Sequence, residues 1–309
     1  MDFVHTPVLP EETIQLLGPR ENGELMVDAT LGEGGHSHAF LSRFPNLRII
    51  GIDADREIQN IARKRLSLFG DRIEWYTGWS QDFFSQTFPE NRQPDTILID
   101  LGISLYHYLN AGRGFSFTRD EPLDMRLDPT RGQTAEDLIA GLSEQALANL
   151  IYANAEERYS RRIARSIKAQ GRIRSSAVLA DAVSRAVPQA YRRGPVHPAT
   201  KTFLALRIAV NRELESLPSL LEKALISLKP GGRMGVISFH SLEDRIVKNF
   251  FREHRKNSPS APIHKGGIVS LLSRKGIIPG PEEMRNNPRS RSARLRVVEK
   301  NVSGIKEGQ

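Results

Sequence analysis

The stretch LMVDATLGEGGHSH at residues 25–38 constrains the fold of this chain more than any other segment. Three apolar residues lead to a carboxylate at Asp28, and Gly32, Gly34 and Gly35 then precede what reads as the start of a helix. Glycine allows positive φ and lets a ligand lie against bare backbone, while a helix N-terminus offers unpaired N–H groups. The stretch therefore predicts the first strand, turn and helix of a nucleotide-binding α/β sheet, although its Gly-x-Gly-Gly spacing is not that of a dinucleotide fingerprint.

Further apolar runs continue the strand–helix alternation, at residues 48–55, 73–78, 96–102 and 234–241. Two of these runs end in carboxylates, Asp53 and Asp100, as the first strand ends in Asp28. The carboxyl ends of parallel strands meet at one edge of a sheet, where ligands bind. Three carboxylates gathered there are costly unless donors or a cation meet them, which favours a ligand with hydroxyls and positive charge.

Two of the residues at this edge have a more specific reading. Asp53 ends the second strand, where such sheets accept the hydroxyls of a ribose, and a turn-forming aspartate is the alternative. Trp79 follows the third strand directly, and an aromatic side chain there either stacks on an adenine or belongs to the core.

From about residue 105 to residue 200 the alternation stops and helical patterns take over. Segments 141–170 and 175–191 read as helices. In the first, Tyr159, Ile163 and Ile167 form an apolar stripe opposite six cations, which are Arg158, Arg161, Arg162, Arg165, Lys168 and Arg172. This face is either a solvated charged surface or, as its cation excess favours, a surface for phosphates. The preceding loop, 113–128, alternates arginines with Phe115 and Phe117 and reads as a lid, a base-stacking element or a packed loop.

The C-terminal part has a cap, a loop and an arginine-rich run. Ser241 stands where the cap of the helix after the fifth strand is expected. Residues 257–284, rich in Pro, Gly, Ser and Lys, predict a loop. The run that follows holds the densest cations of the chain and is a candidate for phosphate contacts: Arg285, Arg289, Arg291, Arg294 and Arg296.

Composition excludes several classes of site. The chain has no cysteine, so disulfides, thiolate metal sites and thiol nucleophiles are absent. The histidines show no metal spacing, and no metal is predicted. A net charge of +8 favours polyanionic partners. The N-terminus lacks the features of a secretory signal, and no apolar run is long enough to span a membrane, so a cytoplasmic protein is expected.

Several blocks resemble the RsmH (MraW) family of ribosomal RNA methyltransferases, over nearly the whole chain from residue 5 to about residue 296. They are DATLGEGGHS, GIDAD, DLGIS, GFSFTRDEPLDMRLDPTRGQ, AEERYSRRIAR, HPATKTFLALRIAVN, PGGRMGVISFHSLEDRIVK and NPRSRSARLR. The resemblance implies an enzyme that transfers a methyl group from S-adenosylmethionine to the exocyclic N4 of a cytidine. That cytidine lies in the decoding centre of 16S rRNA, in the small ribosomal subunit.

The resemblance also implies an architecture and a cofactor site. We expect a Rossmann-like class I methyltransferase sheet built from residues 1–104 and 198–309, with an all-helical substrate-recognition domain inserted at 105–197. The implied cofactor contacts are Gly34, Gly35, His36, Asp53, Trp79, Asp100 and His107. The chain departs from the family at three places: His107 replaces the usual glutamine, Trp79 a phenylalanine and Glu121 a common glycine.

The remaining predictions concern RNA and the proton of the cytosine amine. The predicted RNA contacts are Arg113, Arg162, Arg165, Arg289, Arg291 and Arg294. An acid–Pro–Pro–aromatic motif is absent, because Leu101 follows Asp100. The candidate proton acceptors are therefore Asp100, Asp124, Ser238 and His240, each with packing or capping as the alternative. Two rival functions stay open, a nicotinamide-dependent oxidoreductase and a catalytically inactive RNA-binding protein. The oligomeric state is also open, a homodimer included.

Overall fold

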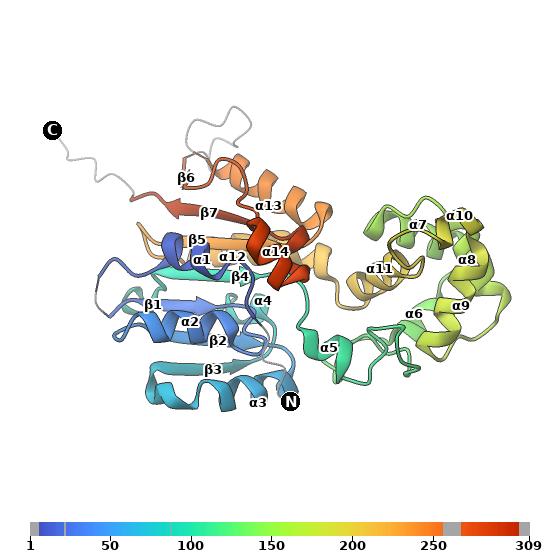
Figure 1. Cartoon of the computed structure of the whole chain (residues 1–309). Helices are drawn as coiled ribbons and strands as arrows, with labels where there is room; N and C mark the ends of the chain where they lie inside the picture. Colours follow the sequence, from blue (N-terminus) through green and yellow to red (C-terminus); the bar gives the residue numbers. More distant parts are fainter. Residues whose placement is uncertain (1–5, 22, 87, 256–266, 303–309) are drawn as a thin grey trace. The chain divides into compact units, whose positions relative to one another are not determined.

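The computed structural model describes residues 6–21, 23–86, 88–255 and 267–302 (Figure 1). The chain divides into two compact units. The first comprises the ranges 1–103 and 216–309, and the second comprises residues 104–215. The second unit is thus an insertion in the first, and each is taken separately below.

The first unit is organised by a seven-stranded sheet with the order β3-β2-β1-β4-β5-β7-β6. The five strands from β3 to β5 in that order are parallel, and β7 runs antiparallel to both β5 and β6. The strands are β1 (Leu25–Asp28), β2 (Arg48–Asp53), β3 (Ile73–Thr77), β4 (Thr96–Asp100), β5 (Arg233–Ser238), β6 (Val269–Leu271) and β7 (Arg294–Lys300). The strand order reverses between β1 and β4, which is where open α/β sheets bind their ligands.

Helices cover both faces of this sheet, because the buried strands are apolar on both sides. On one face Val27 packs with Leu221 and Phe251. On the other face Met26 packs with Leu17 and Phe40. The helices of this unit are α1 (Pro10–Leu17), α2 (Gly35–Arg43), α3 (Arg56–Arg65), α4 (Ser80–Phe83), α12 (Glu213–Ser227, from Ser216 onward), α13 (Ser241–His254) and α14 (Pro281–Asn286), with 3-10 turns η1 (Ser67–Arg72), η2 (Glu90–Arg92) and η3 (Pro288–Ser292).

The second unit consists of helices and connecting loops, the longest between α5 and α6, and its described residues contain no strand of the sheet. Its helices are α5 (Leu105–Leu109), α6 (Ala135–Gly141), α7 (Glu144–Ala155), α8 (Ser160–Ala169), α9 (Ser176–Ala186), α10 (Gln189–Arg192) and α11 (Thr200–Val210). The single helix predicted over 141–170 is wrong. It is interrupted at Glu156, whose left-handed φ of 49° ends α7. No helix of the described part is long and apolar enough to cross a membrane.

The predicted fold class is confirmed in its architecture: an α/β, Rossmann-like sheet interrupted by a helical insertion. The five predicted strands all form. The sequence-based domain boundary at 197/198 assigned α11 to the sheet, whereas the second compact unit extends to Glu215. The reason lies in Asn211, at the end of α11, whose side chain binds the backbone of Met125 and Leu127 in the same unit.

One expectation about the C-terminal part is wrong. The predicted loop 257–284 includes β6 and the start of α14, and its residues 257–266 lie outside the described residues. Part of the arginine-rich run, residues 294–300, forms β7, which pairs with β5 on one side and β6 on the other. Pairing between distant segments of this kind is not encoded in local composition.

Candidate functional site

Three aspartates end three neighbouring strands at the carboxyl edge of the sheet. Asp28 is the last residue of β1, Asp53 of β2 and Asp100 of β4. These strands are adjacent and parallel, with Asp28 paired in register to Gly51 and Leu98. The predicted gathering of carboxylates at the switch point of the sheet is therefore present in the first unit.

The glycine turn between β1 and α2 has the expected backbone. Gly32 and Gly34 have φ values of 53° and 76°, and Gly34 is the N-cap of α2. A side chain at Gly34 would lie 2.8 Å from Leu66, so this glycine is needed for packing as well as for conformation. A side chain at Gly32 would meet no atom closer than 4.0 Å, so the space on that side of the turn stays open.

Asp53 is held rigidly at this turn. Its Oδ2 accepts the N–H of Gly32 at 2.8 Å, and its Oδ1 accepts the N–H of Asp55 at 2.8 Å. A carboxylate has about four acceptor positions, so two backbone hydrogen bonds do not exhaust the acceptor capacity of Asp53. The neighbouring Asp55 caps α3 through the N–H of Glu57. The two carboxylates of the GIDAD block thus have different roles.

Trp79 begins the turn beside Asp53. It is half-buried at the N-cap of α4, and the N–H of Gly78 donates to the backbone oxygen of Asp53 at 2.8 Å. The structure therefore brings an aromatic side chain and the predicted ribose acceptor to the same edge of the sheet.

Asp28, His36 and Asp100 form a buried electrostatic group. Ser37 donates to Asp28 at 2.6 Å, and His36 Nε2 lies 3.6 Å from Asp100 Oδ2. Burial raises the pKa of the Asp28 carboxyl, although the Ser37 hydrogen bond and His36 act against it. Asp100 Oδ1 is buried and has no hydrogen-bond partner within the described residues. This oxygen is the open acceptor of the group.

A pocket of about 570 Å³ lies beside the carboxyl end of β5 and the start of α13. Ile237 of β5 pairs with Asp100 of β4, so the pocket begins one strand away from the carboxylates. Its lining residues are Ser238, Phe239, His240, Ser241, Asp244, Arg245, Lys248, Ser292 and Arg294. Of these, Phe239, Arg245 and Lys248 were not predicted as site residues. The spacing of Arg245 and Lys248 on the polar face of an amphipathic helix was the signal available.

The charge of this pocket is positive. Arg296 donates to both oxygens of Asp244, at 2.7 and 3.0 Å, and its own side chain is only 9% exposed. Asp244 is thereby neutralised, while Arg245, Lys248 and Arg294 all line the pocket. Such a cavity suits an anionic ligand.

His240 caps α13, in place of the predicted Ser241. Its Nδ1 accepts the N–H of Glu243, and the Glu243 carboxylate accepts the N–H groups of Phe239 and His240. Because Nδ1 accepts a hydrogen bond, the single ring proton of a neutral imidazole is on Nε2. Nε2 lies 3.0 Å from the Glu243 carboxylate. Neither nitrogen of neutral His240 is then available as a base.

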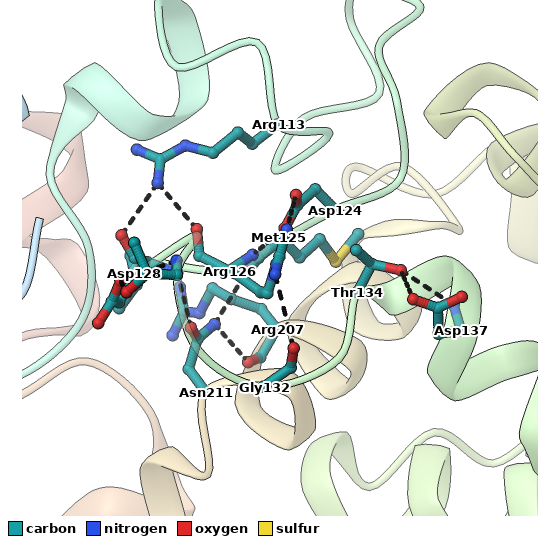
Figure 2. A network of polar contacts seen from close by, with 12 residues as sticks. Arg113, Asp124, Met125, Arg126, Asp128, Gly132, Thr134, Asp137, Arg207 and Asn211 are labelled. Carbon is teal, nitrogen blue, oxygen red and sulfur yellow. Dashed lines mark hydrogen bonds and ion pairs between the residues drawn. The ribbon is translucent and has the colours of Figure 1, made fainter.

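In the second unit, Asp124 and Arg113 belong to a structural network (Figure 2). Arg126 donates to both oxygens of Asp124, at 2.7 and 2.8 Å. Burial acts to raise the pKa of the Asp124 carboxyl, but the hydrogen bonds and charge of Arg126 outweigh it and lower this pKa. Arg113 is buried and donates to the backbone oxygens of Arg126 and Leu127, each at 2.9 Å. Both side chains therefore hold the loop.

Other contacts explain the remaining features of loop 113–128. Phe115 is buried, and Phe117 stacks on His197 with ring centroids 4.3 Å apart, so the packed-loop interpretation fits best. Glu121 accepts the N–H of Gly114 at 2.9 Å, which gives this departure from the family pattern a structural role. His107 is buried in α5, edge-on to Phe115 at 5.4 Å. Its cofactor contact stays a prediction.

The predicted RNA-contacting arginines are otherwise at the surface of their units. Arg162 and Arg165 are exposed on α8, where Arg165 lies 3.4 Å from Glu144. Arg289 and Arg291 are exposed on η3, and Arg294 lines the pocket beside β5. Within the described residues, no group of three or more acidic or histidine side chains is arranged to hold a metal ion, and the absence of a metal stays a prediction.

Comparison with known proteins agrees with the resemblance noted in the sequence. Residues 2–301 match the sequence model of the MraW methylase family. A protein of Treponema denticola named "Ribosomal RNA small subunit methyltransferase H" is 52% identical over 309 residues, covering 97% of this chain and 98% of its own. A protein of the same name from Thermotoga neapolitana is 46% identical over 300 residues, covering 96% and 95%. With the family match spanning nearly its whole length, this chain belongs to the MraW methylase family.

Proposed function

We propose that this protein transfers a methyl group from S-adenosylmethionine to the exocyclic N4 of one cytidine in the decoding centre of 16S rRNA. Its substrate would be the small ribosomal subunit in the cytoplasm. The names of the relatives, matched over almost all of both chains, support an rRNA substrate. The excess of Lys and Arg over Asp and Glu, 44 to 36, fits such a polyanion.

The first unit suits this methyl donor. S-adenosylmethionine carries a ribose diol, an ammonium group and a sulfonium ion, and it supplies an electrophilic methyl group when bound. The carboxylate of Asp53, fixed by two backbone amides, fits the diol. The open side of Gly32 leaves room for a ligand against the backbone, and the half-buried Trp79 fits an adenine face.

The pocket beside β5 suits the target nucleotide. Its size is that of small-molecule sites, which are commonly about 300 to 1,000 Å³. Phe239 offers a ring for a base, and Arg245, Lys248 and Arg294 offer charges for the phosphates. We assign this pocket to the cytidine and its flanking phosphate, next to the carboxylate edge that holds the donor.

We propose that Asp100 accepts the proton that the cytosine amine loses on methylation. Its Oδ1 is buried, lacks a hydrogen-bond partner within the described residues and ends the strand next to the pocket. The rival Asp124 is bound by Arg126, and His240 is committed to the capping box. Ser238 donates toward the backbone of Arg294 at 3.4 Å. This single oxygen of Asp100 is the observation on which the proposed mechanism rests.

The chemistry favours nitrogen as the methylated atom. Methylation at carbon 5 of a pyrimidine ordinarily needs a thiolate nucleophile, and this chain has no cysteine. The lone pair of an exocyclic amine is delocalised into the ring, so a carboxylate that accepts its proton assists the attack. Alignment of the reacting groups can contribute roughly 7 to 11 kcal/mol more.

We also propose that the inserted helical part, predicted over 105–197 and compact over 104–215, recognises the RNA. Its exposed arginines on α8, Arg162 and Arg165 among them, fit phosphates. Arg113 then holds loop 113–128 in place, because its guanidinium donates to backbone oxygens of that loop.

The test uses small subunits isolated from cells that lack this activity and S-adenosylmethionine with a tritiated methyl group. We expect label in 16S rRNA and, after nuclease digestion, a single N4-methylcytidine identified by mass spectrometry. Label at another atom would refute the assigned target. RNA binding without any label would favour the inactive RNA-binding alternative, and reduction of a nicotinamide cofactor would favour the oxidoreductase.

The role of Asp100 is tested separately with Asp100→Asn. A lost proton acceptor should lower kcat by roughly 100-fold or more, while the dissociation constant of S-adenosylmethionine changes less. Asp124→Asn is the matched control. Its kcat should fall far less, because Asp124 pairs with Arg126 and stabilises loop 113–128. If Asp100→Asn raises the KM for the donor and leaves kcat at the wild-type value, then Asp100 only binds the donor.

A further inference from the structure

The break between α7 and α8 in the second unit is built around a fully buried carboxylate. Glu157 has 0% exposure. It accepts the N–H of Tyr159 at 2.8 Å and the hydroxyl of Tyr191 at 2.6 Å. Burial and the bond to Glu157 raise the pKa of Tyr191 to about 12, so this hydroxyl remains a donor at neutral pH. Two segments separated by more than thirty residues are thereby joined at one point.

The two tyrosines so held form one aromatic pair. Their ring centroids lie 5.1 Å apart with the rings nearly perpendicular. Both side chains are partly buried, with part of each accessible to solvent. They come from the start of α8 and from α10, which lie together in the second unit (Figure 1).

Arginine side chains cover this pair. The guanidinium of Arg158 lies 4.8 Å from the ring centroid of Tyr159 and 5.1 Å from that of Tyr191. The guanidinium of Arg162 lies 5.9 Å from the ring of Tyr159. Both arginines are exposed, and no ion pair within the described residues involves either. Guanidinium groups in cation–π contact with the tyrosine rings are thus exposed to solvent and have no carboxylate partner among the described residues.

The surroundings are also cationic. Exposed arginines lie next to the pair in sequence on both helices, namely Arg161, Arg165, Arg192 and Arg193. Lys201 donates to the backbone oxygen of Glu156 at 3.3 Å. The acids nearby are few: Glu157 is buried in its hydrogen bonds, Glu144 pairs with Arg165, and Glu156 at the end of α7 is exposed. The apolar side of α8, Ile163 and Ile167, faces the core, so the fold does not require this arginine surface.

We propose that Arg158, Tyr159, Arg162 and Tyr191 form a stacking platform for an unpaired base of RNA, with the neighbouring arginines contacting its phosphates. The inference rests on the proposed function and specifies how the second unit recognises its substrate. Guanidinium and tyrosine planes stack on any base, and arginine clusters bind phosphates. An acidic protein segment would satisfy the charges but would leave the stacked planes without a partner.

The test measures binding of a fluorescent, unstructured RNA oligonucleotide by anisotropy, with wild type and three variants. Arg158→Ala removes the plane and the charge, and Arg158→Lys keeps the charge but removes the plane. Arg185→Ala is the matched control, since Arg185 is exposed on α9 of the same unit and pairs with Asp181. Stacking of one base corresponds to roughly 5- to 150-fold in affinity.

We expect both Arg158 variants to weaken RNA binding within that range, and Arg185→Ala to leave it nearly unchanged. An oligonucleotide with abasic sites should bind wild type and Arg158→Lys equally, because it offers phosphates but no base to stack. Circular dichroism and binding of S-adenosylmethionine verify that the variants are folded.

Three results would overturn the platform. The first is equal weakening by Arg158→Ala and Arg185→Ala, the second is wild-type affinity in Arg158→Lys, and the third is an undiminished effect of Arg158→Lys on the abasic strand. Displacement of RNA by polyglutamate at equal charge, with the same response to the variants, would assign the surface to an acidic protein. The proposed function fails differently, through absence of methyl transfer by wild type to small subunits.

Discussion

Replacing Asp53 with asparagine should weaken the binding of S-adenosylmethionine by roughly 10- to 150-fold. The side chain is oriented by the N–H groups of Gly32 and Asp55, each at 2.8 Å, and its carboxylate is the proposed acceptor for a ribose hydroxyl. A hydrogen bond to a charged group contributes roughly 1.5 to 3 kcal/mol, and each 1.4 kcal/mol is tenfold in affinity. The range follows from the loss of one such bond.

Isothermal titration calorimetry measures this effect directly, below the melting temperature of each variant. Asp55→Asn is the matched control, because it removes the same charge two residues away. Asp55 caps α3 through the N–H of Glu57, and asparagine caps a helix about as well as aspartate. Its affinity for the donor should therefore be close to that of wild type.

Two results would refute the reasoning about Asp53. Unchanged affinity in Asp53→Asn would show that its carboxylate does not meet the ligand. Equal losses in both variants would show that the net charge of this edge matters and the position of the acceptor does not. A fall in melting temperature of Asp53→Asn is expected in either case, since the amide presents a donor to a backbone N–H.

Three further perturbations follow from the described contacts. Asn211→Ala removes two hydrogen bonds to loop 113–128, with Met125 and Leu127, and one to Arg207 of α11; it should lower the free energy of unfolding by roughly 2 to 4 kcal/mol in urea denaturation. Asp28 has a raised pKa in the folded protein, so the wild type binds more protons when folded and loses stability as pH rises above 3.8; Asp28→Asn should lack this loss. Arg294→Gln and Lys248→Gln should each reduce the slope of RNA affinity against salt by about one unit, if each contacts a phosphate.

Each of these has its own control and contrary outcome. Asn149, which is exposed on α7 and accepts a hydrogen bond from the side-chain amide of Gln145, should tolerate alanine within about 0.5 kcal/mol. A loss as large as that of Asn211→Ala would contradict the network. Parallel stability curves of wild type and Asp28→Asn would mean that Asp28 titrates normally. An unaltered salt slope would separate the pocket from the RNA.

Much of the fold and of the donor site was predictable because the signals are local. A parallel strand that is buried on both faces is a short apolar run, and Asp28, Asp53 and Asp100 each follow such a run directly. The cluster of glycines indicates the turn into α2 in the sequence, and Gly32 and Gly34 have positive φ in the structure. Once the strands are parallel and adjacent, their carboxyl ends must share an edge.

Roles that depend on partners far along the chain were not predictable in this way. Arg296 was one of five arginines in a cationic run, yet pairing of β7 with β5 buries it against Asp244 of α13. His240 was a candidate base until Glu243 completed its capping box. In both cases the side chain's chemistry suits several roles, and the neighbour that selects one is supplied by folding.

By itself, the sequence determined an α/β sheet with a glycine turn, strand-end carboxylates and a helical insertion, because each of these features depends on residues that are close together in the chain. Only the tertiary structure decided which charged side chains form hydrogen bonds or ion pairs within the protein and which can bind a ligand. Asp124, Arg113 and Arg296 are held by partners, whereas Asp100 Oδ1 has no hydrogen-bond partner among the described residues. The physical reason is that burial makes an ionic group costly unless it is paired, and pairing is a property of the folded chain.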